Sequence, residues 1–326
     1  MPPPDRIEVF TLADDRFGLP LAVHGRSLLD HLPADARVRL TVADGGISEA
    51  TKARLTESWA DTRLDVRFVA PGFPDALRLP LWGRMPAITY ARILLASHFD
   101  DDVERVAILD ADTVLCRPLT ELFSLPLHGN LLLAAQDPAI PYADGFDGLV
   151  SWRELGLPPR TPYFNAGVML VDLARWREAG IPERALAFIA EKGGELHYFD
   201  QDALNVAVGP GRWGMLDPRW QVQPRLVEDR RIPMPHLSAG QRAQLKSDPW
   251  LYHFSGRVKP WDVDDGSAAS RRFFELLDRT SWAGWRPARS KVGRLIEFYD
   301  RRLRGHLYPL EQRLCALQRT MSQRRS

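Results

Sequence analysis

Short apolar runs alternate with longer amphipathic stretches through the first hundred residues, and this alternation restricts the fold more than any other feature. The apolar runs are Ile7 to Leu12, Val38 to Val42 and Leu64 to Val69. The stretches with helical spacing that follow them are Leu21 to Leu32, Ser48 to Trp59 and Pro86 to His98. Strands that alternate with helices pair in parallel through crossover connections. The sequence therefore predicts an α/β protein with a mixed, mainly parallel sheet flanked by helices.

The next apolar run, Val106 to Leu109, is typical of a strand buried on both faces, and it ends at Asp110. Ligands bind beyond the carboxyl ends of such strands, so topology alone predicts that Asp110 and Asp112 lie in a site. In an extended stretch, carboxylates at i and i+2 point the same way and can share one hard cation. The simpler alternative is a turn that happens to contain two aspartates.

Three later segments combine polar residues with strand or helix starts in the same way. Asn165 and Gly167 stand at the start of an apolar strand, Ala166 to Val171, where glycine permits close backbone approach. Acid and amide groups cluster at Phe199-Asp200-Gln201-Asp202, the start of a predicted helix that continues to Val208, although either aspartate there could be an N-cap or a first-turn acid. His253, Gly256 and Lys259 are spaced along a third segment, and an imidazole can complete a metal shell.

Together the four segments resemble retaining glycosyltransferase family 8, which contains bacterial lipopolysaccharide galactosyl- and glucosyltransferases and, more distantly, glycogenin. The resemblance covers roughly Ile7 to Trp261. It implies a GT-A type nucleotide-diphospho-sugar transferase fold over residues 1–265. It also implies transfer of a hexose, galactose or glucose, from a UDP-sugar to a hydroxyl of a glycan, glycolipid or small-molecule acceptor.

Residue by residue, the resemblance assigns roles to each motif. Asp110, Asp112 and His253 would hold Mn²⁺ or Mg²⁺, and Gly256 and Lys259 would contact the diphosphate. Asp14 or Asp15 would lie near the nucleobase. The residues expected around the donor sugar are Arg92, Asp137, Asn165, Asp200 and Gln201, of which Asp200 and Gln201 are the candidates for the reacting face. A covalent intermediate and front-face attack both remain open.

Two alternatives compete with this prediction. The run Leu109 to Val114 also fits the D-x-D-x-T-V pattern of haloacid-dehalogenase-type phosphatases, with Asp110 as the nucleophile. That motif normally opens its domain, whereas three strand-helix units precede it here. The second alternative is a sugar-nucleotide or glycan-binding protein without turnover. Such a protein is expected to lose a metal ligand or the phosphate lysine, yet all of these residues are present.

Two further segments lie outside the motifs. Asp137 to Pro162 is rich in Pro, Gly and Asp and predicts a long loop, whose polar and aromatic residues could contact the acceptor or stabilise the loop itself. These residues are Tyr142, Asp144, Phe146, Asp147 and Trp152. Residues 266–326 are expected to form a basic helical extension. Its apolar stripe contains Val292, Ile296, Tyr299, Leu303, Leu307, Leu310, Leu314, Leu317 and Met321.

Charge and cysteine usage limit the partners and the compartment. The whole chain carries a net charge of +1, which gives no general attraction to nucleic acid. From Arg286 onward, however, ten arginines and Lys291 face three acidic residues, a net charge of +8. The tail could therefore pack on the core or on a second subunit, or it could contact anionic lipid. Two distant cysteines and no secretory or membrane-spanning segment predict a cytoplasmic enzyme, with any membrane contact peripheral at the inner surface.

Overall fold

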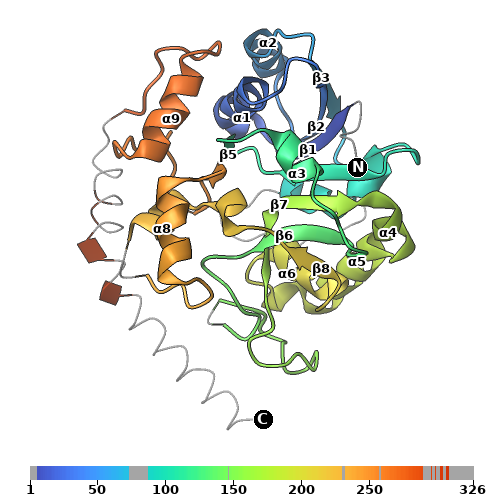
Figure 1. Cartoon of the computed structure of the whole chain (residues 1–326). Coiled ribbons are helices and arrows are strands. Elements are labelled where there is room, and N and C mark those ends of the chain that lie inside the picture. The colour runs from blue at the N-terminus through green and yellow to red at the C-terminus, as the bar shows by residue number, and fades with distance from the viewer. Residues whose placement is uncertain are drawn as a thin grey trace.

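The computed structural model describes residues 6–288 except 73–86, 146, 230, 231 and 257, together with 295, 298, 302, 303, 306 and 307. A seven-stranded sheet in the order β3-β2-β1-β4-β7-β6-β8 forms its centre (Figure 1). The strands are β1 (Ile7–Ala13), β2 (Val38–Asp44), β3 (Leu64–Val69), β4 (Arg105–Leu109), β6 (Leu132–Gln136), β7 (Phe164–Asp172) and β8 (Trp213–Met215). β7 runs antiparallel to β4 and β6, and the other neighbours are parallel. The predicted mixed, mainly parallel sheet is confirmed.

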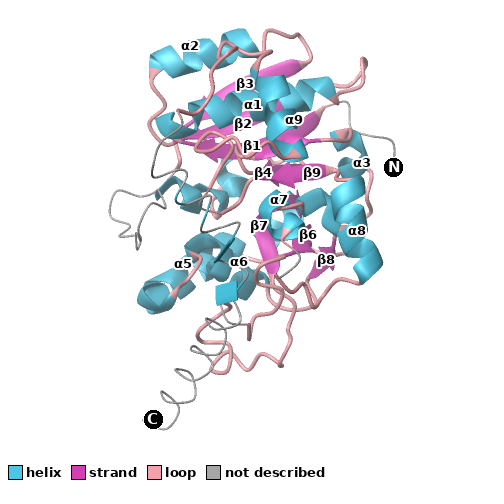
Figure 2. Ribbon diagram, turned by 90° about the vertical axis from the view of Figure 1, so that its left-hand side faces the viewer, coloured by secondary structure: helices cyan, strands magenta, loops and turns pink. Residues whose placement is uncertain are grey.

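The central strands are buried on both faces, which explains their nearly continuous apolar sequence. In β4, Ala107 and Leu109 belong to one core, whereas Val106 and Ile108 belong to the other. The first core includes helices α1 (Gly18–Asp30), α2 (Glu49–Ser58) and α9 (Ala268–Leu277). The second includes α4 (Leu173–Glu178), α5 (Ile181–Lys192) and α6 (Phe199–Val208). Figure 2 shows α1, α2 and α9 in the upper part of the molecule and α5 and α6 in the lower part.

A small second sheet connects distant parts of the chain. β5 (Thr113–Leu115) pairs antiparallel with β9 (Leu251–His253), and Thr113 lies opposite His253. The short helices α3 (Leu119–Phe123), α7 (Pro224–Glu228) and α8 (Ala239–Ser247) lie between the strands in sequence. Because β5 follows directly on β4, this pairing brings the third predicted metal ligand beside the first two.

The predicted helix from Pro86 to His98 is wrong, and Pro86 itself lies outside the described residues. The segment forms two 3₁₀ helices, η2 (Ala87–Arg92) and η3 (Leu95–His98). From Ile88 to Ile93 every residue is buried, so the segment has no solvent-facing side of the kind that a surface helix requires. Short 3₁₀ turns are frequent connectors, and here they place Arg92 in the interior.

The predicted long loop from Asp137 to Pro162 is confirmed, since its described residues contain turns and one isolated bridge, between Tyr142 and Pro162. Helical structure after Ser267 begins with α9, which shares its apolar core with α1. Most of the predicted apolar stripe of the tail lies outside the described residues. Within the part of the chain that the structure describes, no helix is long and apolar enough to span a membrane.

Candidate metal and sugar-nucleotide site

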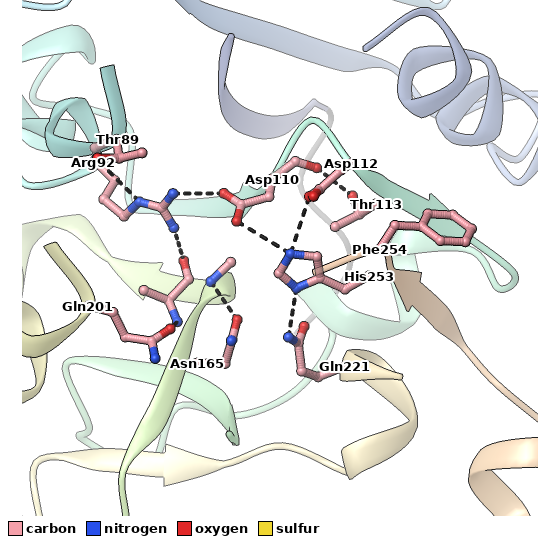
Figure 3. Close-up of polar contacts among 12 residues, drawn as sticks. Thr89, Arg92, Asp110, Asp112, Thr113, Asn165, Gln201, Gln221, His253 and Phe254 are labelled. Atoms are coloured by element: carbon pink, nitrogen blue, oxygen red, sulfur yellow. Dashed lines mark hydrogen bonds and ion pairs between the residues drawn. The ribbon is translucent and has the colours of Figure 1, made fainter. Parts of the chain in front are cut away.

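Asp110, Asp112 and His253 form a compact cluster at the carboxyl end of β4 (Figure 3). Nε2 of His253 lies 3.5 Å from Oδ2 of Asp110 and 3.2 Å from Oδ1 of Asp112. One ligand atom from each residue lies within 4.8 Å of the other two. Two carboxylates and an imidazole are a donor set suited to Mn²⁺ or Mg²⁺. The three predicted metal ligands are therefore brought together, although they come from two separate elements.

The expected extended arrangement of Asp110 and Asp112 is wrong, because both lie in a tight turn. The backbone N–H and the hydroxyl of Thr113 both donate to the Asp110 carbonyl, at 3.0 and 2.8 Å. With its own proton donated, the Thr113 oxygen accepts from Nδ1 of His24, 2.9 Å away. His24 is fully buried in α1, and burial lowers its pKa to about 4, so the ring is neutral at pH 7. The neutral ring of His24 thus stabilises the turn through its hydrogen bond to Thr113.

Gly167 on β7 forms the wall of the cluster. A Cβ atom at this position would lie 2.4 Å from Cε1 of His253 and 2.6 Å from Oδ2 of Asp110. These distances are shorter than a carbon atom tolerates, so a residue with a side chain would displace one of the two ligands. The close backbone approach predicted at Gly167 is observed, and it lets the side chains of His253 and Asp110 lie against the backbone of β7.

Lys259 lies directly on this cluster. Its ammonium group contacts Oδ2 of Asp112 and the carbonyl of Phe254, both at 2.5 Å. Burial by itself raises the pKa of Asp112, but the charges of Lys259 and His253 outweigh it and hold this pKa well below its usual range. Asp112 is therefore ionised throughout the neutral range. Gly256, in the same segment, has a φ of +100° with open space around it, so its backbone conformation explains the glycine.

Arg92 connects the cluster of Asp110, Asp112 and His253 to Asp200. The guanidinium is buried and donates to Asp110 at 2.9 Å and to the Ala166 carbonyl at 2.6 Å, and it pairs with Asp200 at 2.7 Å. Burial raises the pKa of Asp200 to about 6, because it outweighs the attraction of Arg92, and Asp110 adds to the increase. One arginine therefore fixes the positions of two carboxylates that the sequence assigns to different parts of the site.

Asp137, Asn165 and Gln201 form a polar network beside Arg92. Oδ2 of Asp137 accepts from the side-chain amides of Asn165, at 2.7 Å, and Gln201, at 3.2 Å. The two amide oxygens in turn accept from backbone N–H groups of β7, that of Gly167 for Asn165 and that of Ala166 for Gln201. All three side chains are buried. The network fixes the orientation of both amides and gives this side of the site a rigid, polar surface.

Asp14 and Asp15 lie at the carboxyl end of β1, the strand next to β4. Asp14 caps a short 3₁₀ helix by accepting from the N–H of Arg16, whose guanidinium it also binds. Asp15 accepts from the N–H of Ser48 at 2.9 Å, and this bond lowers its pKa. Both aspartates thus have local structural partners, and neither belongs to the metal cluster.

Sequence reasoning missed two residues that touch these motifs, Gln221 and His24. Gln221 contacts His253 and stands in a segment without a recognisable motif. His24 interrupts the apolar face of α1, a pattern more typical of a hydrogen-bonded core residue than of a ligand. The first-turn alternative for Asp202 has direct support, since Asp202 lies in the first turn of α6. Its carboxylate accepts from the N–H groups of His197 and Tyr198 and from the Tyr163 hydroxyl.

Comparison with known proteins connects this geometry to a family. Residues 9–265 match the sequence profile described as Glycosyl transferase family 8. General stress protein A of Bacillus subtilis is 26% identical over 279 residues, covering 85% of this chain and 94% of that protein. The lipopolysaccharide 1,3-galactosyltransferase of Salmonella typhimurium is 25% identical over 203 residues. That match covers 60% of this chain and 55% of the Salmonella protein, so it spans about half of that relative's length.

Solved structures support the same relationship. The galactosyltransferase LgtC, in complex with donor and acceptor sugar analogues, superposes with a TM-score of 0.67 at 26% identity. The match covers 84% of this chain and 96% of LgtC. The bifunctional glycosyltransferase WbbM gives a TM-score of 0.72 at 22% identity, over 86% of this chain and 51% of WbbM, which shows a shared fold. The predicted GT-A fold is confirmed.

Proposed function

The chain belongs to glycosyl transferase family 8 and is a glycosyltransferase, and from this premise we propose that it transfers galactose or glucose with retention from a UDP-sugar to a glycan, glycolipid or small-molecule hydroxyl. The observation that carries the proposal is that the separate sequence motifs converge. His253 contacts both Asp110 and Asp112, and Lys259 contacts Asp112. Arg92 joins Asp110 to Asp200. The family match includes all of these residues, which leaves the phosphatase alternative without support.

Asp110, Asp112 and His253 would hold Mn²⁺ or Mg²⁺, and the donor set fits such an ion. When bound, the cation supplies positive charge to the diphosphate of the departing nucleotide. Lys259 is proposed to contribute a second positive charge to the same diphosphate, and Gly256 a close backbone approach. Asp14 or Asp15 is proposed to contact the nucleobase from the carboxyl end of β1.

The donor sugar is proposed to lie against Arg92, Asp137, Asn165, Asp200 and Gln201. Asp200 and Gln201 would face the reacting carbon. With a pKa of about 6, Asp200 is mostly ionised above pH 7, as a nucleophile in a covalent route must be. In a front-face route the departing phosphate accepts the proton of the acceptor hydroxyl, and Asp200 stabilises the positive charge that develops on the sugar.

The long loop between Asp137 and Pro162 is proposed to border the acceptor, although several of its side chains also stabilise the loop. The guanidinium carbon of Arg160 lies 4.6 Å from the centre of the Tyr142 ring. The backbone N–H of Arg160 donates to Oδ1 of Asp144. Trp152 packs against the loop's apolar cluster. These contacts support a structural role for the three side chains; Phe146 lies outside the described residues. The Salmonella relative's name supports a glycan or glycolipid acceptor.

The proposal is tested with a panel of nucleotide sugars, Mn²⁺ and mass spectrometry of the products. We expect slow hydrolysis of a UDP-hexose, and transfer when the matching acceptor is added. Asp112→Asn and His253→Ala should abolish both activities, while Asp65→Asn, an exposed carboxylate on β3, should keep them. UDP binding without hydrolysis or transfer for any sugar would favour the non-catalytic binding protein instead.

A further inference from the structure

Gln221 is a buried side chain that contacts a proposed metal ligand from outside the four motifs. It ends the short 3₁₀ helix Pro218–Gln221, and only 3% of it is exposed. Nε2 of its side-chain amide lies 2.7 Å from Nδ1 of His253, on the opposite side of the ring from Asp110 and Asp112 (Figure 3). The imidazole therefore lies between an amide and the two carboxylates.

The backbone around Gln221 is fixed relative to His253. The N–H of Val222 donates to the Leu251 carbonyl at 3.0 Å, and the N–H of His253 donates to the Val222 carbonyl at 2.8 Å. Both bonds tie the residue after Gln221 to β9. Because Cε1 of the imidazole also lies against Gly167, the ring is held on one edge by β7 and on another by Gln221.

The two ring nitrogens have different tasks if a cation binds. Nε2 faces both carboxylates and must offer a lone pair, so the ring proton must reside on Nδ1. A proton on Nδ1 needs an acceptor, and the amide oxygen of Gln221 can supply one. Among the residues that the structure describes, no donor faces Oε1 of Gln221. Nε2 faces the ring in this structure, but the two ends of an amide have nearly the same shape, so a half-turn of the amide brings Oε1 to Nδ1 in the same space.

We propose that Gln221 is a positioning residue of the cation site. Its side-chain oxygen accepts the Nδ1–H of His253 and keeps the Nε2 lone pair directed at the space between Asp110 and Asp112. This inference rests on the proposed metal site and adds a residue that orients one of its ligands. Partners of this kind fix both the tautomer and the ring orientation of metal-binding histidines, and their loss typically weakens metal affinity about 10- to 100-fold.

The first test measures Mn²⁺ affinity by electron paramagnetic resonance for the full chain and three variants. Gln221→Leu removes the acceptor at similar size and should weaken binding about 10- to 100-fold. Gln221→Glu keeps an acceptor at the same place and should retain at least the wild-type affinity. Gln223→Leu, two residues further along the same segment, should bind as the wild type does. Wild-type affinity in Gln221→Leu, or a loss in Gln221→Glu as large as in Gln221→Leu, would overturn the inference.

The second test observes His253 directly. With ¹⁵N-labelled histidine and Mg²⁺ at saturation, nuclear magnetic resonance should show the proton on Nδ1 and a lone pair on Nε2, a readout that remains informative if Gln221→Leu folds poorly. A proton on Nε2 of His253 in the Mg²⁺-bound protein would also overturn the proposed role of Gln221. His253→Ala separates the two proposals. If Mn²⁺ binds the wild type and His253→Ala equally, the proposed metal site itself fails.

Discussion

At the scale of single residues, the site consists of buried charges that hold one another in place. Arg92 and Asp200 are both nearly inaccessible to solvent. The fold tolerates these two buried charges because they form an ion pair with each other. The attraction of Arg92 does not fully offset the cost of burying the Asp200 charge, since burial still raises the pKa of Asp200 to about 6. Asp200 is thus retained at a cost to stability, which is common for groups that act on a substrate.

Asp200→Asn should therefore stabilise the fold while abolishing transfer. The folded-state pKa of about 6 lies above the ordinary value of 3.8, so the folded protein binds the proton more tightly than the unfolded chain does. At pH 7 the penalty is on the order of 1–3 kcal/mol, and it is relieved as the pH falls from 6 towards 4. Chemical denaturation of the metal-free protein should show a more stable variant at pH 7.5 and a smaller difference at pH 4.5. A variant less stable than the wild type at pH 7.5 would contradict this reasoning.

Gly167→Ala should remove metal binding with a modest loss of stability. The added methyl group would overlap the His253 ring and the Asp110 carboxylate, and overpacking of this kind costs about 1–3 kcal/mol. Calorimetry with Mn²⁺ and UDP should detect no binding, whereas circular dichroism should show a folded protein. Gly240→Ala on α8 is the matched control, because its methyl group meets no atom closer than 3.9 Å. Normal Mn²⁺ affinity in Gly167→Ala would refute the proposed role of β7.

At the scale of elements, the turn after β4 depends on a helix that carries no motif. His24 in α1 donates to Thr113, and Thr113 donates to the Asp110 carbonyl. On the other side, the N–H of Asp110 donates to the Gly167 carbonyl at 2.9 Å, which continues the pairing of β4 with β7. The position of Asp110, the first proposed metal ligand, is thus set by α1 and β7 together.

Stability should show the titration of His24. Its folded-state pKa of about 4 lies below the ordinary value of 6.5, because burial disfavours the charged ring. The unfolded chain therefore takes up the proton first, and the free energy of unfolding should fall by about 3 kcal/mol as the pH drops from 6.5 to 4. His24→Asn should lack this pH-dependent loss of stability. Comparing the variant with the wild type separates the contribution of His24 from that of Asp200, which has the opposite sign. Denaturation curves at pH 7 and pH 4.5 measure it, and parallel losses in both proteins would contradict the assignment.

The elements that the sequence predicts well are those whose pattern reflects burial. β4 alternates between two cores, so its apolar run and its terminal Asp110 are readable directly. The segment around Arg92 is different, because burial on every side removes the periodicity that separates a helix from a 3₁₀ turn. The contact between Gln221 and His253 depends on tertiary pairing of β9 with a distant segment, and no local spacing encodes it.

At the scale of the whole molecule, the site forms where the strand direction of the sheet reverses. β4 is parallel to β1 on one side and antiparallel to β7 on the other. The proposed nucleotide and metal contacts follow β1, β4 and β9, and the proposed sugar contacts come from η2, the end of β6, β7 and α6. A bound nucleotide sugar would therefore contact residues from strands on both sides of β4. Its binding energy would add to the stability of the entire domain.

Ligand binding should accordingly raise the thermal unfolding midpoint of the domain. At a concentration of one hundred times the dissociation constant, a ligand contributes about 2.7 kcal/mol to the free energy of unfolding. UDP and Mn²⁺ together should raise the midpoint by more than the sum of their separate effects. The reason is that the positive charge of the cation and the negative charge of the diphosphate attract each other when both are bound. His253→Ala should show no such excess in a thermal shift assay. An unchanged excess in that variant would mean that the cation binds elsewhere.

The pairing of β5 with β9 also determines when the protein can begin to work during its synthesis. Lys259 follows Asp112 by 147 residues, so the ribosome delivers the two carboxylates long before their cationic and imidazole partners. A nascent chain that ends before β9 carries Asp110 and Asp112, two of the three proposed ligands, and lacks His253. Affinity for a cation at the proposed site would therefore appear only after β9 has been made and has paired with β5.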